Sequence, residues 1–140
     1  MTNKPKQQGT AAETKHVRRL RNDHPSLAVQ RAPNNAPGRD LEVRLHDGTV
    51  IPIEVKDRAN LNIHTLAAEV ADKQPGSPPI VIWDRKSRKS GNVKRTADGP
   101  SITATTSEFF GYLLDIASVV SLESPWLLER IRDKYPALEI

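Results

Sequence analysis

The chain has 140 residues, no cysteine and a formal net charge of +4. This length suits a single domain with a real core and is too short for two. The absence of cysteine excludes disulfides, thiolate catalysis and Cys-ligated zinc, and the four histidines lack the spacing of a helical zinc site. No apolar run approaches a membrane span, and the polar N-terminus lacks the apolar core of a signal peptide. We therefore expect a cytoplasmic protein with no membrane segment.

Positive charge is concentrated in two parts of the chain. Residues 1–39 carry eight Lys or Arg against two acids, and residues 85–95 carry six more. Clustered positive charge attracts the phosphates of a nucleic acid without sequence recognition, because binding releases condensed counterions. A polyanionic partner is the expectation, and a basic tail that only aids solubility is the common alternative.

The first predicted element is a helix that follows a polar tail. Residues 1–9 are polar and are expected to be disordered. Thr10 and Glu13 have the spacing of a capping box, in which both side chains satisfy backbone donors of the first turn, so the helix is predicted to begin near Thr10. Pro25 ends it.

A short strand and a loop lead from this helix to Asp40. Residues 27–29 read as the strand, and the loop after it is rich in Pro, Asn and Gly. Loops beside an active site often contact the substrate, so Arg31 and Arg39 are candidate phosphate contacts. A plain surface connection is the alternative.

Residues 41–45 and 51–56 show the alternation of a β-hairpin, with a His-Asp-Gly turn between them. Period-two alternation gives each strand one apolar and one polar face. Glu54 and Lys56 therefore lie on the same face. Pairing of the two strands brings Asp40 near them, at the open end of the hairpin.

Asp40 and Glu54 are candidate ligands for Mg²⁺ or Mn²⁺, because hard cations prefer oxygen ligands. A metal makes its bound water easier to deprotonate and offsets charge that builds on a phosphate. A lysine beside it, such as Lys56, can orient or deprotonate the attacking water or stabilise the phosphate oxygens. The alternative for the same residues is a hairpin whose charged face makes cross-strand ion pairs.

Downstream of the hairpin we predict a helix over about residues 60–73 and a strand over residues 80–83. The strand is a continuous apolar run, which is typical of a strand covered on both faces, and its Trp83 is expected in the core. The charged run over residues 84–95 predicts an exposed arm that grips DNA, or a solvated turn. Its candidate DNA contacts are Arg85, Lys86, Arg88, Lys89, Lys94 and Arg95.

The last predicted elements are a strand over residues 100–105 and two helices. The first helix is capped at residue 106 or 107, and the second begins at Ser124, which precedes a first-turn proline. Both helices carry apolar stripes larger than one sheet needs. This surplus suggests a dimer interface, although ordinary core packing explains it nearly as well.

The order of these elements resembles that of the PD-(D/E)xK nuclease superfamily, and most closely its Holliday-junction resolvase-like members of archaea and phages. The motif consists of Asp40, thirteen residues, Glu54, one residue and Lys56. Arg39 stands where the family often has proline. The resemblance implies that Asp40 and Glu54 hold the metal and that Lys56 acts on water. By its position on the first helix, Glu13 would complete the metal site, unless it only caps the helix.

The resemblance also implies a fold and an activity. The fold is α/β, a mixed central sheet flanked by helices around a restriction-endonuclease-like core, with residues 10–140 as a single domain. The activity is Mg²⁺-dependent cleavage of DNA, with four-way junctions as substrate and a symmetric homodimer as the active form. The rival from another class is a non-catalytic, basic nucleic-acid-binding module with the same fold. Both predict salt-sensitive binding, but only the enzyme predicts metal-dependent cleavage.

Overall fold

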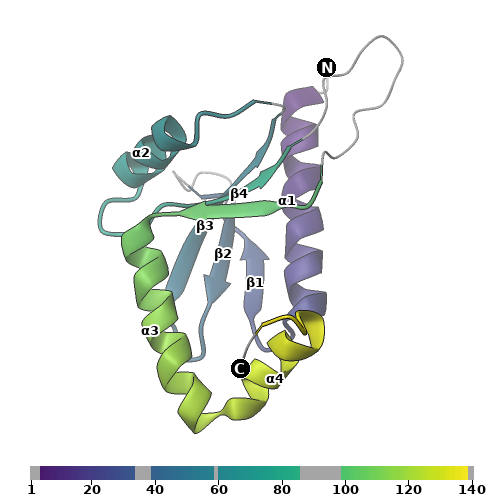
Figure 1. The fold of residues 1–140 in the computed structure, drawn as a ribbon. Coiled ribbons are helices and arrows are strands. Elements are labelled where there is room, and N and C mark those ends of the chain that lie inside the picture. The colour runs from purple at the N-terminus through teal and green to yellow at the C-terminus, as the bar shows by residue number, and fades with distance from the viewer. Residues whose placement is uncertain (1–3, 34–38, 59, 86–98, 139–140) are drawn as a thin grey trace. The chain divides into compact units, whose positions relative to one another are not determined.

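The computed structural model describes residues 4–33, 39–58, 60–85 and 99–138 (Figure 1). The chain divides into two compact units, residues 1–105 and residues 106–140. The first unit holds a five-stranded sheet with two helices, and the second holds two further helices. The α/β class, with a mixed sheet flanked by helices, is confirmed. The single domain expected over residues 10–140 stays a prediction about how the two units fold.

Helix α1, Lys4–Asp23, begins six residues before the predicted start near Thr10. Residues 4–9 are helical, which corrects the expectation of disorder there, and residues 1–3 lie outside the described part of the chain. Lys and Gln are good helix formers, and a proline at position 5 is tolerated because it falls in the first turn. The expected capping box at Thr10 is therefore wrong, since Thr10 and Glu13 lie inside the helix.

The sheet has the order β1-β2-β3-β4-β5, and all neighbours are antiparallel except β3 and β4. The predicted hairpin is confirmed: β2 pairs with β3, with Leu41 opposite Ile53. Its turn contains Gly48 at φ +92°, a conformation that L side chains rarely adopt. The strands are β1 (Ala28–Arg31), β2 (Leu41–Arg44), β3 (Val50–Asp57), β4 (Ile80–Asp84) and β5 (Ile102–Thr105).

Strand β3 changes its pairing partner in the middle. Residues up to Ile53 pair with β2, and residues from Glu54 onward pair in parallel with β4. The backbone of β3 therefore loses its β2 neighbour at the point where Glu54 and Lys56 begin. This branch point is where the candidate site forms.

The two helices of this unit cover opposite faces of the sheet. Val81 and Asp84 lie three residues apart in β4, so their side chains point to opposite faces. Helix α1 reaches Asp84 through His16, whereas α2 (Ile63–Lys73) packs Leu66 and Val70 against Val81. The layers are thus helix, sheet and helix (Figure 1).

Local chemistry explains where α2 begins. It starts three residues later than predicted, because Asn62 caps it: the Asn62 Oδ1 accepts a hydrogen bond from Thr65 N at 3.1 Å. The apolar side chains of the strands and of both helices then close the core around the sheet. Buried apolar residues include Ala12, Val17, Val29, Leu41, Val43, Ile53, Val55, Leu66, Val70, Ile80, Val81 and Ile82.

The second unit consists of α3 (Ser107–Glu123) and α4 (Pro125–Lys134). As predicted, Thr106 caps α3 by accepting a hydrogen bond from Phe109 N at 3.1 Å, and α4 begins directly after Ser124. Neither helix buries a residue, and large apolar side chains such as Phe110, Ile116 and Trp126 are more than half exposed. In the described ranges of the chain, no helix combines the length and the apolar content needed to cross a membrane.

Candidate functional site

Glu54 and Lys56 form the centre of the candidate site on β3. Their side chains point to the same face of the sheet, as the alternation predicted, and Lys56 Nζ lies 3.1 Å from Glu54 Oε1. Glu54 is only 8% exposed. A carboxylate removed from water in this way needs a charged or hydrogen-bonding partner, and the lysine ammonium provides it.

Asp40 lies at the branch point, immediately before β2. Its backbone N donates to Ile53 O at 2.8 Å, and its Oδ2 accepts from Val55 N at 2.7 Å. Val55 follows the last residue pair shared by β2 and β3, so the carboxylate takes up a backbone donor that the β2 ladder no longer serves. The backbone groups of Ile53 and Val55, on either side of Glu54 in the chain, therefore hold Asp40 in place.

Glu13 lies on α1, far from Asp40 in the sequence, and the structure places it beside Asp40. Its carboxyl lies close enough to Asp40 to raise the pKa of the Asp40 carboxyl. Its Oε2 also lies 3.0 Å from Arg31 Nη2 and 3.1 Å from Arg31 Nε, so two guanidinium nitrogens contact the same carboxylate oxygen. The structure therefore places Glu13 beside Asp40 and Lys56 against Glu54, with Lys56 close enough to Asp40 to lower its pKa.

The pKa of Asp40 reports how crowded this site is. Burial raises the pKa of its carboxyl above the ordinary value, and the nearby charge of Glu13 raises it further. The Val55 N–H and the Lys56 ammonium lower this pKa, without cancelling the rise. An acid cluster in this state favours an added positive charge, either a proton or a cation.

Carboxylate oxygens are the donors that Mg²⁺ and Mn²⁺ prefer, so the residue types of this cluster suit such an ion. The described residues contain no group of three or more His, Asp or Glu side chains placed as metal ligands. Lys56 and Arg31 instead neutralise Glu54 and Glu13. A bound cation would replace these contacts at the carboxylate oxygens.

The predicted DNA contacts are only partly described by the structure. Arg31 is bound to Glu13, and Arg39 Nη1 lies 3.1 Å from Glu42 Oε1. Arg85 is exposed directly after β4. Lys86, Arg88, Lys89, Lys94 and Arg95 lie outside the described residues.

Sequence reasoning missed a buried polar network that holds α1 against the sheet. His16 is fully buried, and its Nε2 lies 2.5 Å from Asp84 Oδ2 at the end of β4. Ser101 donates to the other oxygen of Asp84, and Arg19 Nε donates to His16 Nδ1 at 3.3 Å. The one available signal was that His16 follows Glu13 by three residues, and therefore lies on the same side of α1.

The protonation of this network follows from its contacts. Burial lowers the pKa of His16 more strongly than Asp84 raises it. Burial raises the pKa of Asp84, but hydrogen bonds from Ser101 and His16 outweigh it, and the net pKa is lowered. The neutral imidazole thus donates from Nε2 to an ionised carboxylate, a tautomer that leaves Nδ1 free to accept from Arg19.

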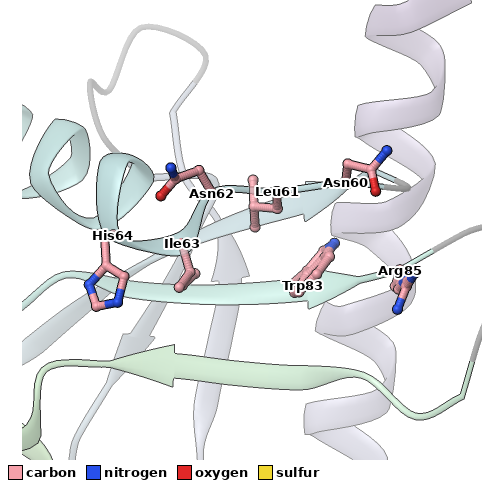
Figure 2. A pocket seen from close by; sticks show the side chains of 7 residues that line it. All are labelled: Asn60, Leu61, Asn62, Ile63, His64, Trp83 and Arg85. Atoms are coloured by element: carbon pink, nitrogen blue, oxygen red, sulfur yellow. The ribbon is translucent and has the colours of Figure 1, made fainter.

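Trp83 is not the core residue that was expected. It is half-buried and lines a pocket together with residues 60–64 and Arg85 (Figure 2). The prediction was wrong because it assumed that both faces of β4 are covered along its whole length. Helix α2 covers Val81, but the face of the sheet at Trp83 stays open.

Comparison with protein-family models, with curated proteins and with solved structures gave no match to this chain. The site is therefore defined by its own residues and contacts.

Proposed function

We propose that this protein is a metal-dependent endonuclease of the PD-(D/E)xK type that hydrolyses phosphodiester bonds in DNA. The observation that carries the proposal is that Asp40, with Glu13 beside it, is held by Val55 N at the branch point of β3, next to the Glu54–Lys56 pair. These residues come from a helix and two strands, and their types and order are those that the resemblance implies. The antiparallel hairpin followed by a parallel strand also supports a nuclease-like core.

In this proposal Asp40 and Glu54 hold Mg²⁺ or Mn²⁺, and Glu13 is the third carboxylate beside Asp40. When bound, the ion supplies charge stabilisation for the phosphate and a water of lowered pKa. Lys56 changes its partner from Glu54 to the substrate, where its ammonium orients the attacking water or donates to the phosphate oxygens as their charge grows. Val55 N–H keeps Asp40 in place throughout.

The proposed substrate is branched DNA such as a four-way junction, cut by a homodimer in a cytoplasm-like compartment. The basic residues supply attraction to phosphate, while selection of a branched shape depends on where the backbone is held. Two equivalent cuts in a junction require two equivalent subunits. The exposed apolar side chains of α3 and α4 support self-association, because such surface is costly to leave in water.

One observation favours the rival, a non-catalytic DNA-binding module. Glu54 and Glu13 each already have a cationic side chain as partner, through Lys56 and Arg31. A site built only for stability needs nothing more. The two functions share DNA binding and differ in cleavage.

The test is cleavage of a labelled four-way junction, beside linear duplex and single strand, with Mg²⁺, Mn²⁺ or EDTA. The enzyme predicts paired, metal-dependent cuts in the junction. Glu54→Gln and Lys56→Ala should each slow cleavage by about 100-fold or more, with binding in EDTA unchanged. The matched controls are Glu69→Gln and Lys73→Ala, both at exposed positions of α2; both should cut like the wild type.

If the wild type binds the junction but cuts it in neither metal, and if Glu54→Gln and Lys56→Ala change nothing, the nuclease proposal is wrong. The binding module is then the better account.

A further inference from the structure

An open pocket of about 700 Å³ lies beside the candidate active site and has no role in the mechanism above. It is lined by Trp83 in β4, by Arg85 directly after this strand, and by residues 60–64, which include the start of α2. Figure 2 shows this segment running alongside the end of β4, with Trp83 between it and the strand. All of these residues belong to the unit that carries the candidate site.

The pairing of β3 with β4 places this pocket next to Lys56. Trp83 is the register partner of Lys56, and Val81 is the partner of Glu54. Partners in parallel strands point to the same face, and neighbouring strands lie about 4.8 Å apart. A phosphate bound at Lys56 would therefore have its own nucleotide within reach of Trp83.

Three lining residues of the pocket, Trp83, Leu61 and Ile63, give it an apolar wall. Trp83 Nε1 donates to Arg58 O at 2.9 Å, and this bond fixes the orientation of the indole ring. Leu61 and Ile63 pack against the core cluster of α2 and β4. A flat, apolar ligand can therefore contact the indole ring and these two side chains.

The rim of the pocket is polar and positively charged. Asn60 and His64 are exposed and offer hydrogen-bond donors and acceptors, whereas Asn62 is committed to capping α2. Arg85 adds a guanidinium at the end of β4. An entirely apolar ligand would leave this rim unused, and a free phosphate would not use the indole.

We propose that this pocket binds one unstacked nucleotide of the DNA substrate. The base lies against Trp83, Leu61 and Ile63, its edge meets Asn60 and His64, and Arg85 contacts a flanking phosphate. Base stacking on aromatic rings and hydrogen bonds to base edges are the contacts by which proteins hold single-stranded nucleotides. The inference rests on the proposed function only for the orientation of this nucleotide toward Lys56.

The pocket gives a reason for preferring branched DNA. A base in a continuous duplex must be unstacked and unpaired before it can enter the pocket. A base where the arms of a DNA junction meet, or in a single-stranded flap, has already lost part of its stacking and pairing. The protein is therefore expected to bind DNA with an unpaired nucleotide more tightly than continuous duplex of equal length and charge.

The first experiment uses Trp83 as its own reporter. The full chain carrying Glu54→Gln and Trp126→Phe retains Trp83 as its single tryptophan, and EDTA prevents cleavage. We expect a trinucleotide of deoxyadenosine to quench its fluorescence to saturation, and a fully abasic trinucleotide with the same phosphates to leave it unchanged. Equal quenching by the two probes would mean that the site binds phosphate alone, and would overturn the proposal.

The second experiment avoids any change to the core. Asn60→Ala combined with His64→Ala alters two exposed side chains, and should weaken binding of a duplex with one unpaired adenosine about tenfold, without changing binding of continuous duplex. His46→Ala, on the exposed hairpin turn, is the control. Equal affinity of the double variant and the wild type for the unpaired adenosine would contradict the pocket.

Failure of this inference and failure of the proposed function give different results. If Trp83 fluorescence ignores the trinucleotide while the junction is still cut through Glu54 and Lys56, the pocket proposal is wrong and the nuclease stands. If the trinucleotide quenches Trp83 but no DNA is cut in either metal, the nucleotide site stands and the nuclease proposal is wrong.

Discussion

Asp84→Ala tests how α1, and with it Glu13, is held against the sheet. The Asp84 residue is 4% exposed and accepts hydrogen bonds from His16 on α1 and from Ser101 before β5. Lys15 Nζ lies 3.8 Å away, but its side chain is half exposed, so that contact contributes little. Removing the carboxylate leaves the fully buried imidazole N–H of His16 without its acceptor.

The expected loss follows from this burial. A hydrogen bond to a charged group contributes about 1.5–3 kcal/mol, and an unsatisfied buried donor costs about 1–3 kcal/mol. Ser101 is exposed and can turn to water, so its hydroxyl adds little to the loss. We expect Asp84→Ala to lower the free energy of unfolding by about 3 kcal/mol, a large part of the roughly 5–15 kcal/mol typical of a domain. Asp84→Asn keeps an oxygen acceptor for neutral His16 and should cost about 1 kcal/mol.

The assay is urea denaturation at pH 7.5, followed by circular dichroism. Asp72→Ala, on the exposed side of α2, is the matched control and should stay within about 0.5 kcal/mol of the wild type. An Asp84→Ala protein as stable as this control would refute the idea that the network anchors α1. If His16 were protonated, Asp84→Asn would remove an ion pair and would lower the free energy of unfolding as much as Asp84→Ala does. Equal losses for the two variants would therefore refute a neutral His16.

Two further predictions concern pH and Asp40. Because burial lowers the pKa of His16 below its usual 6.5 in the folded state, unfolding takes up a proton below that pH. The free energy of unfolding should therefore fall as the pH drops below 6.5. Urea titrations at pH 7.5 and 5.5 should show a smaller fall for His16→Gln than for the wild type. The same fall in both proteins would contradict this prediction. Because burial raises the pKa of Asp40, its ionised form costs stability at neutral pH. Asp40→Asn should abolish cleavage and leave the unfolding free energy at pH 7.5 equal or higher, and a clearly less stable variant would show that the Asp40 charge holds the fold together.

The sequence by itself determined the elements whose cause is local. Period-two alternation predicted the hairpin and placed Glu54 and Lys56 on one face, because side-chain direction in a strand depends only on the position of the residue along it. The start of α3 was equally readable from its cap Thr106, and the start of α4 from Pro125 after Ser124, although the Ser124 side chain makes no capping hydrogen bond. Asp40 was predicted at the open end of the hairpin, although its bond to Val55 N needed the structure.

Only the tertiary structure decided which distant residues meet. Glu13 comes beside Asp40 because His16 binds Asp84, 68 residues further along the chain, and fixes the rotation and position of α1. Trp83 lies in a pocket rather than the core because α2 covers only part of its face of the sheet. Such contacts depend on how whole elements pack, and the packing free energy is shared among many side chains, so no local pattern records it.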